Sequence, residues 1–325
     1  MSISRLTESP SDLRRFRSSL LRWFDRNQRP LPWRESRDPY RIWISEIMLQ
    51  QTRVAAVLAH YRRFLDRFPD VRSLAKARVS AVLAAWSGLG YYRRSRALHA
   101  AAQAIVSEHG GRFPQSAPEW RELPGIGRYT AAAIASIAFN QPVAVVDGNV
   151  ERILRRLAHH ASMPPSNAWS LAQLLLSPSR PGDFNQAMME LGALVCLPGQ
   201  PNCKACPVER WCVTRGPLGV GDKELRQVKQ VAYSLAERDD RVYLVRRSAA
   251  ASLMPGMWEL PEIEPDGATA AFSLRHSITV TDYRVSVFRR NAPLNGAGRW
   301  LSKTKLPTLP LTGLARKILQ RSGVL

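Results

Sequence analysis

The 325-residue sequence has no uninterrupted apolar run of about 18 residues, which argues against a membrane-spanning helix. Its first residues also lack the apolar stretch of a secretory signal. We therefore expect a cytoplasmic protein without a membrane partner. Cysteine is scarce, with four residues in the chain. Because disulfides are rare in the cytosol, these cysteines are expected to be free thiols or metal ligands.

Acidic residues are few relative to basic ones. The chain has 26 Asp and Glu against 47 Lys and Arg, a formal net charge of +21. The basic residues are spread along the chain, so no single tail carries the excess. Such a charge indicates a polyanionic partner, nucleic acid before membrane. The length and the 45% hydrophobic residues favour two domains with packed cores.

Apolar residues recur with a helical period over most of residues 11–195, where Ser11 or Asp12 is expected to cap the first helix. The only strand-like run there is Val143–Val146. A Gly- and Pro-rich segment at 216–228 predicts a linker. Strand patterns follow at 231–235, 241–246, 277–281 and 283–288, with a terminal helix at 311–320. The sequence thus predicts a mainly α part followed by a small α+β domain.

A tight turn at Leu123–Gly127 lies between two helical patterns. Upstream, Ser116 and Glu119 have capping-box spacing. Gly125 and Gly127 permit a sharp turn and the close approach of a partner. Amides at the start of the following helix suit a phosphate. Asp147 follows an apolar run and begins a further helix, whose dipole favours a carboxylate. Alone, the stretch indicates only helices joined by turns.

The four cysteines fall in one short window with the spacing C-x6-C-x2-C-x5-C, at Cys196, Cys203, Cys206 and Cys212. Four thiolates suit a closed zinc site or an iron–sulfur cluster, and ligand rules alone leave both open. Trp211 and two basic residues lie within the window, which suits a loop that also touches DNA.

With this cysteine set, several motifs carry a resemblance to a known family. They are RPLPWR at 29–34, SEIMLQQT at 45–52, GLGYY at 88–92, LPGIG at 123–127, VDGNV at 146–150 and FNQAMMELG at 184–192. The chain resembles the helix–hairpin–helix DNA glycosylases with a [4Fe–4S] cluster, and within them the adenine DNA glycosylases. The match is continuous over about residues 15–215. Residues 254–261 and 306–311 more weakly resemble the family's Nudix-like domain.

The resemblance implies a domain organisation. Residues 1–28 and 139–215 would form one helical subdomain, with the cluster bound by the four cysteines. Residues 29–138 would form a six-helix subdomain that contains the helix–hairpin–helix. Residues 229–325 would form the Nudix-like domain. The short 267–274 segment leaves little room for a Nudix helix, so we expect no Nudix hydrolysis.

The resemblance also implies roles in cleaving an N-glycosidic bond. Glu46 would protonate the leaving adenine and assist the water, and Asp147 would stabilise the sugar cation, with Asn149 as a supporting hydrogen-bonding residue. Independently, the apolar neighbours of Glu46 predict a raised pKa. Bifunctional relatives carry a Schiff-base lysine where this chain has Tyr129. Because tyrosine has no amine, we expect a monofunctional glycosylase.

The implied partner is double-stranded DNA with adenine opposite 8-oxoguanine or guanine, bound by a monomer in the bacterial cytoplasm and nucleoid. The target base must leave the stack to be reached. The resemblance assigns DNA or base contacts to Arg29, Trp33, Arg34, Gln50, Gln51, Tyr91 and Gln186, and a phosphate grip to Leu123, Gly125 and Gly127. The RPLPWR loop suggests that its Trp33 is exposed, although a core position for this residue is an equal alternative.

One departure concerns the opposite base. Where the family has a Phe-Ser-His loop that reads 8-oxoguanine, this chain has Ile278, Thr279 and Val280. Thr279 keeps a hydroxyl for partial readout. A plain A·G mismatch is the alternative substrate, and a glycosylase for thymine in T·G is an alternative enzyme, although Gln50 and Gln51 argue for adenine. The carboxylates argue against a third reading, a non-catalytic iron–sulfur DNA-binding protein.

Overall fold

The structure is a computed structural model that describes residues 9–159, 163–218, 227–251, 253–265, 267–278, 281–292 and 298–325. The chain divides into two compact units, one of residues 1–54 and 104–221 and one of residues 55–103 and 222–325. The predicted subdomain boundaries stay a prediction, and part of the predicted linker, 219–226, lies outside the described residues. Among the described helices, none has the length and apolar character needed to cross a bilayer.

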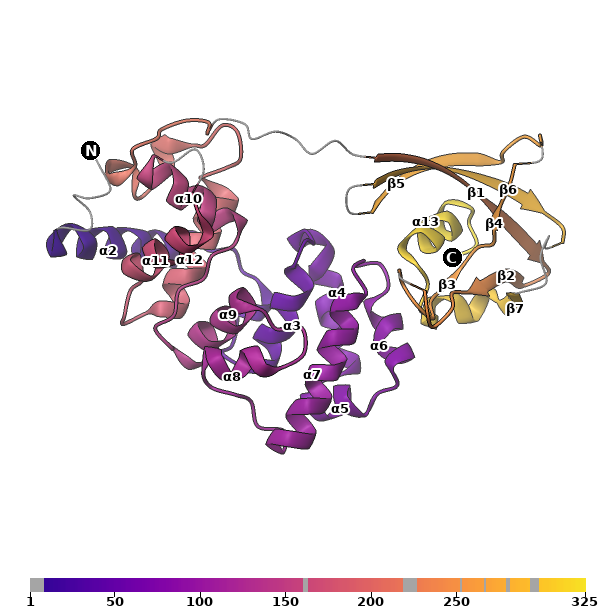
Figure 1. The fold of residues 1–325 in the computed structure, drawn as a ribbon, viewed down its shortest axis with the longest axis horizontal. Helices are drawn as coiled ribbons and strands as arrows, with labels where there is room; N and C mark the ends of the chain where they lie inside the picture. Colours follow the sequence, from indigo (N-terminus) through magenta and orange to yellow (C-terminus); the bar gives the residue numbers. More distant parts are fainter. Residues whose placement is uncertain are drawn as a thin grey trace. The chain divides into compact units, whose positions relative to one another are not determined.

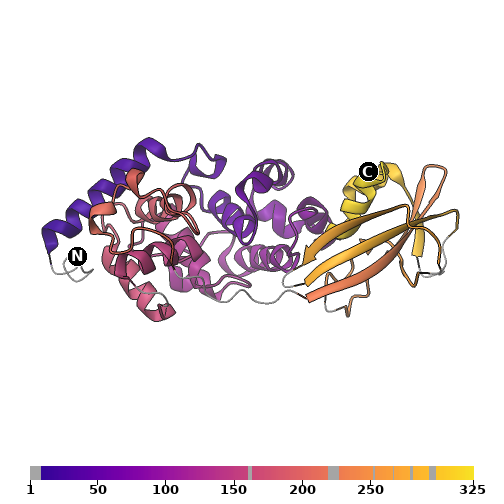
Figure 2. The ribbon, with the colours of Figure 1, turned by 90° about the horizontal axis from the view of Figure 1, so that it is seen from above.

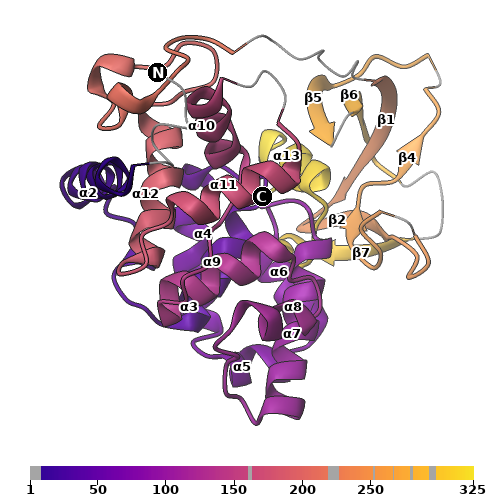
Figure 3. The same cartoon turned by 60° about the vertical axis from the view of Figure 1, so that its left-hand side comes forward.

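The described residues of the first unit form helices joined by loops, without a strand. It contains α2 (Pro10–Asn27), η1 (Pro32–Arg34), α3 (Pro39–Leu49), α8 (Ala117–Glu122), α9 (Arg128–Phe139), α10 (Gly148–Ala158), α11 (Pro165–Leu175) and α12 (Pro181–Leu194) (Figure 1). Helix α12 packs against α2, α9 and α10, and α10 also packs against α11 (Figure 3). Their shared core includes Phe16, Leu154, Phe184 and Leu191, each at most 2% exposed. The predicted mainly α part is confirmed.

The helix ends show which of the predicted capping residues begin a helix. Ser116 and Glu119 form the predicted capping box at α8. Asp147 caps α10 by accepting a hydrogen bond from the Val150 amide. The expected cap of the first helix is wrong, because the side chain of Ser9 accepts from the Asp12 amide and α2 begins at Pro10. Proline suits the first helical position, where no intrahelical amide bond is lost.

The strand-like run at 143–146 forms no strand. Side chains from neighbouring helices bind its backbone instead. Gln173 of α11 accepts from the Ala144 amide at 2.9 Å, and Asn185 of α12 accepts from the Val145 amide at 3.2 Å. Asn185 also donates to the Val143 carbonyl at 2.9 Å. These bonds satisfy the buried backbone that leads to Asp147, so its approach to α10 is fixed from two helices.

The second unit combines helices with a sheet. Its helices are α4 (Val54–Arg67), α5 (Val71–Lys76), α6 (Val79–Trp86) and α7 (Arg93–His109), followed near the end of the chain by η4 (Lys303–Thr308) and α13 (Gly313–Arg321). The turn at 88–92 joins α6 to α7, as predicted. The expected terminal helix at 311–320 corresponds to α13, which the Thr312 side chain caps.

The strands of the described chain are β1 (Gln227–Arg238), β2 (Arg241–Arg246), β3 (Trp258–Glu259), β4 (Glu262–Ile263), β5 (Phe272–Ile278), β6 (Thr281–Arg290) and β7 (Gly298–Ser302). The central order is β3-β2-β1-β6-β5, with β1 and β6 parallel and the other pairs antiparallel. Figure 2 shows the long strands of this sheet side by side. Leu244, Val287 and Ile318 belong to the core between sheet and α13. The predicted α+β domain is confirmed. The described residues between β4 and β5 form no helix, as expected, and the Nudix-like likeness stays a prediction.

Candidate active site

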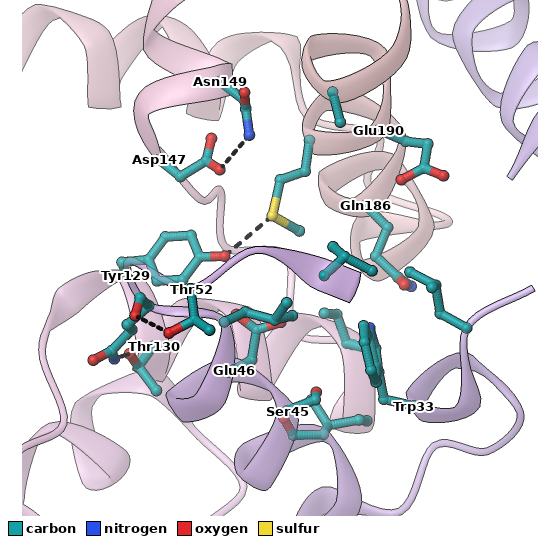
Figure 4. A pocket seen from close by; sticks show the side chains of 18 of the residues that line it. Trp33, Ser45, Glu46, Thr52, Tyr129, Thr130, Asp147, Asn149, Gln186 and Glu190 are labelled. Carbon is teal, nitrogen blue, oxygen red and sulfur yellow. Dashed lines mark hydrogen bonds between the residues drawn. The ribbon is translucent and has the colours of Figure 1, made fainter. Parts of the chain in front are cut away.

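A cavity of about 740 Å³ opens in the first unit between α3, the start of α9, the start of α10 and α12. Its volume is typical of small-molecule pockets, about 300–1,000 Å³. Eleven of the predicted site residues line it, namely Arg29, Trp33, Arg34, Glu46, Gln50, Gln51, Gly127, Tyr129, Asp147, Asn149 and Gln186. Figure 4 shows side chains from α3, α9, α10 and α12 around this cavity. Segments far apart in the sequence thus form one site.

Glu46 lies on α3 and is 6% exposed. Its pKa is raised from 4.5 to about 7, mainly by burial; the nearby Asp147 carboxylate also raises the pKa, whereas the neighbouring Tyr129 hydroxyl and the charge of Arg34 lower it. The predicted rise is confirmed, and its main cause is the predicted one, loss of water around the carboxylate. At neutral pH, the carboxyl group is therefore about half protonated and able to give a proton.

Asp147 is held at the start of α10 by both carboxylate oxygens. Oδ1 accepts from the Val150 amide at 2.7 Å, and Oδ2 accepts from Asn149 Nδ2 at 3.1 Å. Arg152 in turn donates to Asn149 Oδ1 at 2.8 Å and to the backbone carbonyls of Gly192 and Cys196 at 2.7 and 2.8 Å. These bonds fix the rotamer of the Asp147 side chain. The predicted supporting contact of Asn149 is present.

Tyr129 reaches into the cavity from α9 (Figure 4). Its hydroxyl donates to the sulfur of Met189 at 3.1 Å. Burial raises its pKa well above the usual value, and the carboxyl groups of Glu46 and Asp147 add to the effect. The phenol is therefore a neutral hydrogen-bond donor beside the acid. It has no amine with which to form a Schiff base.

Glu190 on α12 is the main pocket residue that the sequence analysis did not single out. It is 1% exposed, and its carboxylate accepts from Arg29 at 2.7 and 2.8 Å and from Arg34 at 2.9 and 3.1 Å. Burial alone would raise its pKa, but the hydrogen bonds from both arginines outweigh burial and lower it to about 2. Arg34 also donates to Gln186 Oε1 at 3.1 Å. Because arginine only donates, Gln186 turns its amide oxygen toward it.

The packing of α12 on α10 depends on a residue without a side chain. A Cβ at Gly192 would lie 2.5 Å from the Cβ of Asn149. Real Cβ atoms do not approach that closely, so the helices can reach this separation only with glycine at 192. The close approach brings the Gly192 carbonyl within reach of Arg152. It thereby supports the contacts that orient Asp147.

The predicted phosphate grip lies at the turn between α8 and α9. Gly125 has φ +75°, a conformation that favours glycine, whereas Gly127 is extended. No protein atom lies within 4 Å of a Cβ built at Gly127, so space for a partner remains. The Leu123 side chain is buried and anchors the turn, and the phosphate contact of the backbone amides stays a prediction. The Arg128 guanidinium lies 3.9 Å from the centre of the Trp169 ring, which holds the start of α9 against α11.

The remaining residues predicted to contact DNA or the base differ in exposure and backbone conformation. Trp33 is 7% exposed, so of the two readings the core position is confirmed and the exposed one is wrong, and the ring borders the cavity. Gln50 donates to Thr130 at 3.1 Å. Gln51 is exposed with φ +54°. Tyr91 belongs to the second unit, is 42% exposed and has φ +48°. Thr279 lies outside the described residues, so its predicted role stays a prediction.

The four cysteines lie after α12, and each is partly buried. Burial raises the pKa of Cys206 to about 12 and that of Cys212 to about 11, and the neighbouring cysteines add to both. Arg156, 2% exposed, donates to Cys196 Sγ at 3.0 Å. Trp211 packs edge-on against Phe16 in the core, and the expected contact of this loop with DNA stays a prediction.

These surroundings fit a thiolate-bound group. Within the described ranges, no three His, Cys, Asp or Glu side chains are arranged to hold a single metal ion. A four-iron cluster takes one thiolate for each iron, so its ligands need not meet at one point. Buried thiolates also require positive charge nearby, which the iron and Arg156 would supply.

Comparisons with known proteins agree with this site. The model of HhH-GPD superfamily base excision DNA repair proteins matches residues 44–175. A solved structure of a thermostable thymine-DNA glycosylase is similar with a TM-score of 0.58 and 30% identity, covering 62% of this chain and 95% of that one. The fold and the pocket thus place the chain among helix–hairpin–helix base excision repair proteins.

Two curated relatives show which family of these base excision repair proteins the chain belongs to. The adenine DNA glycosylase of Mus musculus is 48% identical over 227 residues, 64% of this chain and 44% of that protein. The adenine DNA glycosylase of Schizosaccharomyces pombe is 33% identical over 323 residues, 78% of this chain and 70% of that protein. The chain belongs to the adenine DNA glycosylase family. It spans less than half the length of the mouse protein.

Proposed function

We propose that this protein is a monofunctional DNA glycosylase that removes adenine mispaired with 8-oxoguanine or guanine. The single observation that carries the proposal is the buried Glu46, with a pKa of about 7, across the cavity from the fixed carboxylate of Asp147. An acid that is protonated near neutral pH and an ionised partner are the two groups that hydrolysis of an N-glycosidic bond needs.

In the proposed reaction, Glu46 donates its proton to the adenine as the bond between base and sugar breaks. Asp147 remains ionised and stabilises the positive charge on the sugar. Glu46, now a carboxylate, then takes a proton from the water that adds to the sugar carbon. The products are free adenine and an abasic site. Tyr129 leaves the strand intact, because no covalent amine adduct forms.

The adenine would enter the cavity after leaving the stack. Arg34 and Gln186 would bind it, and Glu190 keeps both in place through the bonds to Arg34. Gln186 directs its amide oxygen to Arg34, so its amide nitrogen is the group available to donate to an acceptor on the base. The relatives named adenine DNA glycosylases support this base over thymine.

Double-stranded DNA is the proposed partner of the basic surface, with net charge +21. The hairpin turn at 123–127 would bind a phosphate, and Gln51 and Tyr91 would contact the opened duplex. The four cysteines would hold a [4Fe–4S] cluster, which when bound would tie the loop 196–212 into a fixed shape. The monomeric state and the cytoplasmic location stay predictions.

The test is a panel of labelled duplexes with A·8-oxoG, A·G, T·G and C·8-oxoG pairs, incubated with the protein and then treated with alkali. We expect cleavage at adenine in the first two duplexes, and only after alkali. Product from T·G alone would favour the thymine alternative. A protein that binds the duplexes but produces no abasic site at adenine would contradict the proposal.

A further inference from the structure

The turn between α6 and α7 presents Tyr91 in an unfavourable backbone conformation. Gly88, Gly90 and Tyr91 have φ values of +106°, +71° and +48°. Glycine adopts such values freely, but a tyrosine in the left-handed region is rare. The Tyr91 ring is nevertheless 42% exposed, so burial of the ring does not compensate for the strain. Other contacts of the turn must therefore hold it.

One set of these contacts comes from the adjoining helices. Trp86 Nε1 donates to the Gly90 carbonyl at 3.1 Å, and Arg94 donates to the carbonyls of Leu89 and Gly90, both at 3.3 Å. The Arg94 guanidinium also lies over two rings, 5.3 Å from the centre of Tyr91 and 5.5 Å from that of Trp86. Arg94 thus fixes both the backbone and the ring of the turn.

The second set comes from the C-terminal part of the same unit, more than 200 residues away in the sequence. Tyr92, the last residue of the turn, and Ser87, the residue before it, both donate their hydroxyl protons to the Leu311 carbonyl, at 2.9 and 3.1 Å. Arg316 of α13 donates to Ser87 Oγ at 2.9 Å. Tyr92 is 4% exposed, Ser87 6% and Leu311 0%. Both lone pairs of one buried carbonyl therefore bind the two ends of the turn.

We propose that Tyr92 and Ser87 are positioning residues, through which the α+β domain holds Tyr91 in its outward conformation, ready to enter the duplex beside the target base. This proposal rests on the proposed function, from which Tyr91 takes its contact with DNA. Without the two hydroxyl bonds, the turn can relax to a more common backbone conformation, and the ring is presented less often.

The test uses the full chain with Tyr92→Phe and Ser87→Ala. Single-turnover adenine release is measured at saturating protein from two duplexes with the same mispair. One is fully stacked around the adenine, and in the other a neighbouring bulge has already unstacked it. The loss of one buried hydrogen bond predicts release about tenfold slower from the stacked duplex. Release from the bulged duplex should match that of the unsubstituted chain.

Two further variants separate this role from simple loss of stability. Tyr243→Phe is the matched control, because that buried hydroxyl accepts from the Gly298 amide at 2.6 Å within the sheet. It should leave release from both duplexes unchanged. In a Tyr91→Ala background, Tyr92→Phe should not slow adenine release further. If Tyr92 acts through Tyr91, the effects of the two substitutions are not additive.

The outcomes are distinguishable. Equal slowing on both duplexes, additive losses with Tyr91→Ala, or normal release by Tyr92→Phe and Ser87→Ala would each overturn the positioning role while the proposed function stands. An unsubstituted chain that releases adenine from neither duplex overturns the proposed function itself, and this role with it.

Discussion

The substitution Glu46→Gln keeps the shape of the buried side chain and removes its titratable proton. Glutamine resembles the protonated acid, which is the form that burial favours in this cavity. The variant should therefore fold and bind DNA. Because its amide cannot protonate a leaving base, release of adenine should fall by at least about 10²-fold, the lower range for loss of a general acid.

The same substitution should change stability in a pH-dependent way. The folded-state pKa of Glu46 is raised from 4.5 to about 7. A raised pKa means that the stability contribution is fully present below pH 4.5 and is lost as the pH rises through 7. At about 1.4 kcal/mol for each pH unit, the folded chain with Glu46 loses about 3 kcal/mol over this window. The glutamine variant does not lose it.

We therefore expect the variant to match the unsubstituted protein at about pH 4 and to be more stable by up to about 3 kcal/mol at pH 8.5. Urea unfolding of both proteins at the two pH values measures this difference. Titration of all other groups cancels in the comparison, because both chains share them. Adenine release by the unsubstituted protein should also fall as the pH rises above about 7, where Glu46 loses its proton.

Two results would refute this account of Glu46. A variant that is less stable than the unsubstituted protein at pH 8.5 would mean that Glu46 is held as a paired carboxylate. A variant that releases adenine at near-normal single-turnover rates would mean that another group supplies the proton.

Three other predictions concern the rest of the candidate site. Tyr129→Lys should give a covalent DNA adduct that borohydride traps, because an amine replaces the phenol; no trapped adduct would count against the assigned position. Glu190→Gln should cost about 3–5 kcal/mol in urea unfolding, because Arg29 and Arg34 lose their shared buried carboxylate. The matched control is Asp25→Asn, which breaks an exposed pair and should cost less than about 1 kcal/mol; equal losses would contradict this reasoning. Finally, purified protein should be brown and contain iron, and chelators that remove the iron should release the loop 196–212 from α10, whereas a colourless, zinc-loaded protein would rule out the iron–sulfur proposal.

Several features could be predicted because their causes are local in the sequence. The capping box of Ser116 and Glu119 and the cap by Asp147 depend on spacings of three residues. The raised pKa of Glu46 follows from apolar neighbours on its own helix. The helical period of apolar residues predicted most of α3–α12, because this period is also local in the sequence.

What could not be predicted depends on partners far away in the sequence. Glu190 binds Arg29 across 161 residues, and Tyr92 binds Leu311 across 219. Trp33 follows a proline and precedes an arginine, yet tertiary packing buries it. Whether such a side chain is buried depends on which helices pack against it. The residues next to it in the sequence do not show which helices these are.

Gly192 has a practical consequence for engineering. Replacing a glycine inside a helix with alanine is a standard way to gain stability, about 1 kcal/mol on helix propensity. At this position in α12, the new methyl group would meet the Cβ of Asn149 at 2.5 Å. The first turn of α10 would have to move, and Asp147 with it. A stabilised version of this protein should therefore keep glycine at 192. Even Gly192→Ala would displace Asp147 and so impair the reaction, although residue 192 does not line the cavity.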